Sequence, residues 1–175
     1  MKKLVIFYDD KKKSCCEYAE AFAGQENAEC RKASDYPDQK PIYAMDCKIG
    51  LIFESERGRV PYSILHVIWR LTATKTEKHM ILVTGGQKEF HGIRTAMEEM
   101  RQRGYETGSV YSRYLIEKQR MGTEEAVEWM LHELSEGYEN LLAKDRYEGL
   151  SGRTLRRHLR EEIRHYREYK KHQQI

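Results

Sequence analysis

The sequence predicts an α/β protein built in three layers, with a doubly wound parallel sheet of five strands and an extra basic helix at the C-terminus. Short apolar runs recur along the chain without polar alternation, which is typical of strands buried on both faces. Segments with helical apolar spacing follow these runs. Alternating strands and helices form right-handed crossovers, and therefore a parallel sheet with helices on both sides.

Each element has its own signal. Five runs are predicted as strands, namely 4–8, 28–33, 49–53, 80–83 and the weaker 109–115. Four amphipathic helices are predicted after Ser14, after Pro61, from Phe90 and from Thr123. Gly24 and Gly104 end the first and third of them, and the buried stripe of the fourth extends to Leu141. Thr84-Gly85-Gly86 is predicted as a loop.

The composition changes after residue 144, so we divide the chain into a domain over 1–144 and a basic helical extension over 145–175. Thr154 is the expected cap of the last helix. Its narrow apolar stripe predicts docking on the body or on a partner through a strip. The helix is dense in arginines, which are Arg153, Arg156, Arg157, Arg160, Arg164 and Arg167. They could contact nucleic acid or an acidic protein, but Glu161, Glu162 and Glu168 favour a solvated face with intrahelical ion pairs.

Composition excludes several classes of function. The 31 basic residues exceed the 28 acidic ones by a net charge of only +3, which argues against a nucleic-acid partner unless the charge is clustered. The four cysteines include no CxxC pair, so we expect reduced thiols, no metal site and a cytoplasmic location. No apolar run approaches the roughly 20 residues that span a bilayer. No histidine lies beside a nucleophile in a hydrolase motif.

Three segments resemble short-chain flavodoxins, particularly the menaquinone-dependent protoporphyrinogen oxidase type. The segment Leu4-Val-Ile-Phe-Tyr-Asp-Asp-Lys-Lys-Lys-Ser-Cys-Cys-Glu-Tyr-Ala-Glu is similar to the first strand, phosphate loop and helix of that family. Lys48-Ile-Gly-Leu-Ile-Phe with Gly58-Arg-Val-Pro resembles the third strand and the loop beside the flavin. Met80-Ile-Leu-Val-Thr-Gly-Gly resembles the fourth strand. The resemblance covers roughly 1–142 and implies flavin mononucleotide (FMN) as cofactor.

The resemblance places the FMN phosphate at loop 9–15, where a helix N-terminus offers backbone N–H groups. The loop residues implied as its contacts are Asp10, Lys11, Lys12, Lys13, Ser14 and Cys15. The loop departs from the family pattern. Asp10 replaces a hydroxyl, Lys13 a small glycine, and Cys15 a threonine that would donate a stronger hydrogen bond. A polar turn that binds no ligand is the alternative, and a redox-active Cys15–Cys16 pair is a third hypothesis against inert packing.

The flavin ring is expected between two further loops. The residues implied there are Ser55, Arg57, Gly58, Thr84, Gly85 and Gly86. Loop 54–59 lacks the aromatic residue that normally stacks on the ring, and Tyr62, Phe90 or His91 are the nearby substitutes. Gly85 and Gly86 permit close backbone approach, although an ordinary glycine turn explains them equally well. Arg57 either contacts the flavin or lies in solvent.

Two functions follow. The first is an FMN protein that transfers electrons to a redox partner or reduces a small acceptor. The second is a domain that has lost its flavin and serves as a binding or regulatory module through its basic C-terminal helix. The altered phosphate loop and the missing aromatic favour the second, and the order of the matching segments favours the first. Because flavodoxin-like reductases often pair, a homodimer is compatible with either.

Overall fold

The computed structural model describes residues 2–173 and contains a five-stranded parallel sheet with the order β2-β1-β4-β6-β7. The strands of this sheet are β1 (Leu4–Tyr8), β2 (Ala28–Lys32), β4 (Lys48–Ser55), β6 (Lys78–Gly86) and β7 (Glu106–Ser112). All four neighbouring pairs are parallel. This is the order of flavodoxin-like doubly wound sheets, and it confirms the predicted fold class.

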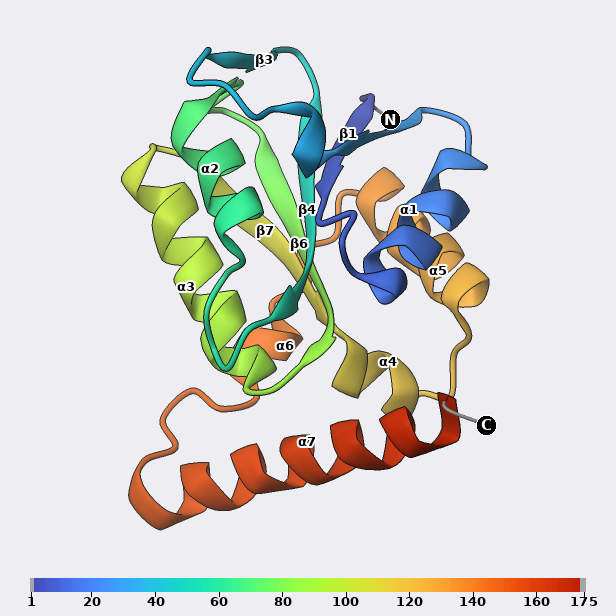
Figure 1. The fold of residues 1–175 in the computed structure, drawn as a ribbon, viewed down its shortest axis with the longest axis vertical. Helices are drawn as coiled ribbons and strands as arrows, with labels where there is room; N and C mark the ends of the chain where they lie inside the picture. The colour runs from blue at the N-terminus through green and yellow to red at the C-terminus, as the bar shows by residue number, and fades with distance from the viewer. Residues whose placement is uncertain (1, 174–175) are drawn as a thin grey trace.

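Helices cover both faces of the sheet (Figure 1). The helices are α1 (Lys13–Ala23), α2 (Tyr62–Arg70), α3 (Glu89–Gln102), α4 (Arg113–Lys118), α5 (Thr123–Ser135), α6 (Leu142–Asp145) and α7 (Gly152–Gln173). The helices α1 and α5 pack together on one face, and α2, α3 and α6 pack on the other. Each layer has its own apolar core against the sheet.

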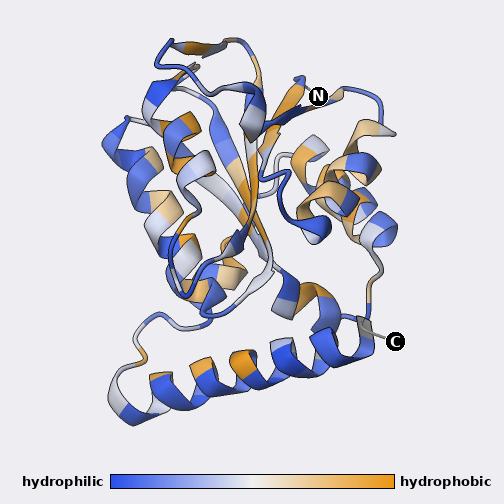
Figure 2. Ribbon diagram, viewed as in Figure 1, coloured by the Kyte–Doolittle hydropathy of each residue, from blue (hydrophilic) through white to orange (hydrophobic). Residues whose placement is uncertain are grey.

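All five strands run in the same direction, so their carboxyl ends meet at one edge of the sheet. The helices α4 and α7 lie at this edge, and α7 crosses below it along its whole length (Figure 1). Most of α7 is hydrophilic, in contrast to the apolar strands above it (Figure 2). In doubly wound folds ligands bind at this edge, where the chain reverses direction between β1 and β4.

The structure differs from the sequence predictions in four places. The last strand is β7, which ends at Ser112, and residues 113–115 begin helix α4 because Ser112 caps it through a hydrogen bond from the Leu115 N–H. Thr84-Gly85-Gly86 belongs to β6. Helix α5 ends at Ser135, so Leu141 lies outside it. A short ribbon of β3 (Ile42–Ala44) and β5 (Leu71–Ala73) was not predicted.

Within the described residues, no helix is both long enough and apolar enough to cross a bilayer.

Candidate functional site

The loops after β1, β4 and β6 converge at the carboxyl edge around an open cavity of about 450 Å³. It is lined by Lys12, Glu54, Ser55, Glu56, Arg57, Arg59, Gly86, Gln87, Tyr166 and Lys170. Four of these side chains are basic and two are carboxylates. The last two residues come from α7, so the C-terminal helix forms one wall of the predicted flavin site.

The hydroxyl of Ser14, the residue predicted to bind a phosphate, is already hydrogen-bonded within the chain. It donates to the Glu54 carboxylate at 2.9 Å and lies 2.8 Å from the Thr84 hydroxyl. A carboxylate from β4 therefore takes the position of a phosphate acceptor beside the N-terminus of α1. A flavin phosphate at this point would be repelled by the charge of Glu54.

The other predicted loop residues mostly face away from the cavity. The Asp10 carboxylate accepts hydrogen bonds from the N–H and the hydroxyl of Ser34, which outweigh burial and hold the pKa of Asp10 below its ordinary value. Lys13 is exposed and pairs with Glu17 on the outer side of α1. Lys11 is also exposed. Of the six predicted loop residues, only Lys12 lines the cavity.

The cysteines at the start of α1 do not form a redox pair. Cys15 is fully buried, its Sγ lies 3.2 Å from the Thr84 hydroxyl, and burial raises the pKa of its thiol to about 12. The Cys16 thiol donates to the Asp10 carbonyl, and burial also raises its pKa. Both cysteines are free thiols. A raised pKa removes the thiolate that redox chemistry needs, so inert packing is the appropriate interpretation.

The loop after β4 is held by the chain itself. The Ser55 hydroxyl donates to the Gln87 carbonyl at 2.7 Å and accepts the N–H of Gly58 at 3.0 Å. Gly58 has a φ of 91°, and a Cβ there would lie 2.9 Å from the Cβ of His91. These two predicted site residues therefore shape the loop, while Arg57 is exposed at its tip.

The two glycines at the end of β6 have structural reasons of their own. A Cβ on Gly86 would lie 2.1 Å from the Ser55 carbonyl oxygen, so only glycine lets β4 and β6 approach here. At Gly85 a Cβ would meet Nη1 of Arg113 at 2.8 Å and the ring of Tyr166 at 3.4 Å. The space against Gly85 is thus filled by side chains from α4 and α7.

The residues present do not fit FMN in the manner of a flavodoxin. The phosphate position holds the Glu54 carboxylate, and the aromatic ring against Gly85 belongs to Tyr166 of the same chain. The open cavity beside them is lined mainly by charged groups, whereas flavin rings bind against apolar or aromatic walls. Backbone N–H groups at the start of α1 are the one part of the predicted cradle that remains suitable for an anion.

Sequence reasoning missed the role of Tyr166, Lys170 and Glu54. The first two are spaced i, i+4 on α7 and reach the same cavity, with the Lys170 ammonium 5.1 Å from the centre of the Tyr166 ring. The apolar stripe that contains Tyr166 predicted docking, but not the place where the helix docks. Glu54 gives no signal of its own, because its partner Ser14 is 40 residues away in the sequence.

A buried polar cluster holds α7 on the body. The Glu162 carboxylate pairs with the Arg146 guanidinium, and both side chains are buried. Arg146 also lies between the rings of Tyr114 and Tyr147, 4.6 and 4.4 Å from their centres. A second ion pair joins His165 to Glu117 of α4. The helix is therefore attached at several points rather than by its apolar stripe alone.

The arginines of α7 point away from this seat. The exposed basic residues form what we call the outer stripe, which comprises Arg153, Arg156, Arg157, Arg160, Arg164, Arg167 and Lys171. The ion pairs of α7 are Arg146–Glu162, Glu117–His165 and His158–Glu161 in the described part of the chain, and none includes a residue of the outer stripe. The prediction that intrahelical ion pairs neutralise these arginines is therefore wrong, because Glu162 turns inward and Glu161 pairs with His158.

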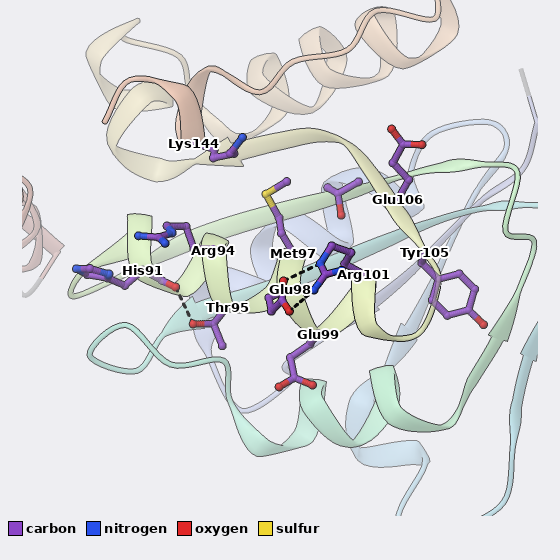
Figure 3. Close-up of a pocket in the computed structure, with 11 residues that line it drawn as sticks. His91, Arg94, Thr95, Met97, Glu98, Glu99, Arg101, Tyr105, Glu106 and Lys144 are labelled. Atoms are coloured by element: carbon purple, nitrogen blue, oxygen red, sulfur yellow. Dashed lines mark hydrogen bonds and ion pairs between the residues drawn. The ribbon is translucent and has the colours of Figure 1, made fainter. Parts of the chain in front are cut away.

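The largest cavity lies elsewhere, between α3 and the start of β7, with a volume of about 830 Å³ (Figure 3). It is an open groove, and its most prominent feature is the ion pair between Arg101 and Glu98. None of the predicted site residues lines it. We do not assign it a function.

Comparison with models of known protein families and with curated protein sequences found no match to this chain. The functional argument therefore depends on the geometry of the carboxyl edge and of α7.

Proposed function

We propose that this protein is a flavodoxin-like domain that works without a flavin and acts as a binding module, presenting the outer stripe of α7 to an anionic partner. The observation that carries the proposal is that Glu54 and Tyr166 fill the two positions where the phosphate and ring of a flavin would lie. The sheet then serves as a rigid platform for the helix. The ion pair of Glu162 with Arg146 fixes which face of α7 points outward.

Titration of FMN with the purified protein tests the flavin-free part of this proposal. We expect no quenching of flavin fluorescence at micromolar FMN, and no change with the Glu54→Gln variant. Saturable quenching by the unmodified protein would contradict the proposal. Quenching by Glu54→Gln alone would show that a phosphate site survives and that one carboxylate closes it.

The second candidate function is electron transfer or reduction of a small acceptor with bound FMN, together with a redox partner protein. The cavity at the carboxyl edge favours it, because Lys12, Arg57, Arg59 and Lys170 provide positive charge where doubly wound folds bind anionic ligands. This function requires Tyr166 to leave Gly85 or to serve as the wall of the ring. A Tyr166→Ala variant that binds FMN more tightly than the parent protein would support displacement. A variant that loses measurable binding would support the wall.

A further inference from the structure

The outer stripe of α7 is one continuous line of positive charge. Its residues recur at intervals of three, four, seven and eleven, which places them within an arc of about 100° on a helix with 3.6 residues per turn. The buried Glu162 lies on the opposite side of the helix. The 22 residues of α7 make the helix about 33 Å long. A cation therefore faces solvent at nearly every turn over that length.

The positive charge of the chain is concentrated here. Residues 152–173 contain eight arginines and lysines against three glutamates, while the whole chain has a net charge of only +3. Glu162 is buried and Glu161 pairs with His158, so little negative charge remains beside the stripe. The small net charge that argued against a polyanion is an average over a slightly acidic body and a strongly basic helix.

The chemistry of the stripe distinguishes between classes of polyanion. Six of its seven residues are arginines, whose planar guanidinium groups bind phosphate oxygens through two parallel hydrogen bonds. The stripe contains no aromatic or aliphatic residue. Helices that insert into membranes carry apolar anchors on the binding face, and protein interfaces depend on similar buried anchors. A face made only of guanidinium and ammonium groups matches a regular row of phosphates better than either alternative.

We propose that the outer stripe of α7 binds the phosphate backbone of nucleic acid, without reading its sequence. This inference rests on the proposed function and names its partner class. The length of the stripe is close to one turn of a DNA duplex, about 34 Å, so several phosphates can be contacted at once. The binding energy comes largely from counterion release, and the affinity depends steeply on salt.

Fluorescence anisotropy with a labelled DNA duplex of random sequence tests the inference with the full-length protein. We expect the affinity to fall by about 10²- to 10³-fold between about 50 and 200 mM salt, as for roughly five phosphate contacts. The triple variant Arg156→Gln, Arg160→Gln and Arg164→Gln removes three exposed charges without removing an ion pair. We expect it to reduce the slope of log affinity against log salt by about 3.

A matched control removes the same charge elsewhere. Lys32→Gln, Lys40→Gln and Lys75→Gln are exposed positions outside α7, and their combined variant should leave the affinity and the salt slope unchanged. Equal effects of the two triple variants would overturn the inference, because net charge alone would then explain binding. So would two duplexes of equal length and different sequence that bind with clearly different affinity.

Two other probes separate this inference from the proposed function. Poly-L-glutamate and vesicles that contain phosphatidylserine offer acidic protein chemistry and a membrane surface. If either binds the stripe more tightly than the duplex at equal charge concentration, the nucleic-acid inference fails while the binding module stands. If none of the three probes binds, both fail. If FMN binds and the duplex also binds through the stripe, only the flavin-free part of the proposed function fails.

Discussion

The buried ion pair between Glu162 and Arg146 gives the sharpest prediction, because it should decide whether α7 stays on the body. Replacing Glu162 with alanine leaves the Arg146 guanidinium between two tyrosine rings without a carboxylate. Removal of one partner of a buried pair costs about 3 to 5 kcal/mol. We take about 3 kcal/mol, since the Arg146 side chain retains 11% of its exposure and can gain some hydration.

The cost should appear as local opening of α7. The helix lies outside the two apolar cores that hold the sheet, so it can detach without unfolding the domain. A cost of about 3 kcal/mol raises the population of the open helix by about 10²-fold. Trypsin reports this directly, because α7 carries eight cleavable arginines and lysines. We expect cleavage in α7 to accelerate by about this factor, with little change in the Tm of the remaining domain.

The control is Glu168→Ala, which removes an exposed glutamate from the same helix. Its cleavage rate should equal that of the parent protein. The reasoning is refuted if Glu162→Ala and Glu168→Ala are cleaved alike. It is also refuted if Glu162→Ala lowers the Tm of the whole domain, because α7 would then unfold together with the sheet.

Three further predictions concern the body of the protein. His79 is fully buried and burial lowers its pKa to about 4, so its contribution to stability is complete above about pH 6.5 and is lost as the pH falls toward 4; chemical denaturation should show a loss of about 3 kcal/mol that the His79→Gln variant lacks. Burial raises the pKa of Glu89 to about 7, so its contribution is complete below about pH 4.5 and is lost as the pH rises through 7; Glu89→Gln should be more stable than the parent at pH 8 and similar to it near pH 4.5. Gly86→Ala should prevent folding as judged by circular dichroism, because its Cβ meets the Ser55 backbone at a φ of 90°, whereas Gly50→Ala meets only movable side chain atoms and should fold with a lower Tm.

The fold could be predicted because its signals are local. A strand buried on both faces, such as β4, is a continuous apolar run, and a helix such as α3 shows its buried stripe within a few turns. The end of the last strand was harder to predict. Val110 and Tyr111 continue the strand pattern, but the Ser112 hydroxyl caps a new helix at once, and such capping depends on backbone angles rather than composition.

The site could be predicted only as a location. Its loops follow from the topology, since parallel strands end at one edge. What fills the edge depends on contacts between distant residues, Ser14 with Glu54 and Gly85 with Tyr166. Neither pair has a spacing that periodicity could reveal. The predicted residues Ser55, Gly58 and Gly86 are therefore correctly placed at the edge, while their contacts are internal to the chain.

The two properties of α7 depend on one orientation. The face that carries Tyr166 and Glu162 covers the carboxyl edge, so the arginines on the opposite face must point to solvent. A helix detached by Glu162→Ala would uncover Gly85 while keeping its arginines. The variant should then bind the duplex at least as well as the parent, because the stripe needs no seat to present its charge. If it also gains FMN binding, α7 is a cover over a working flavin site. If it does not, Glu54 alone is enough to exclude the phosphate, and the flavin-free function stands.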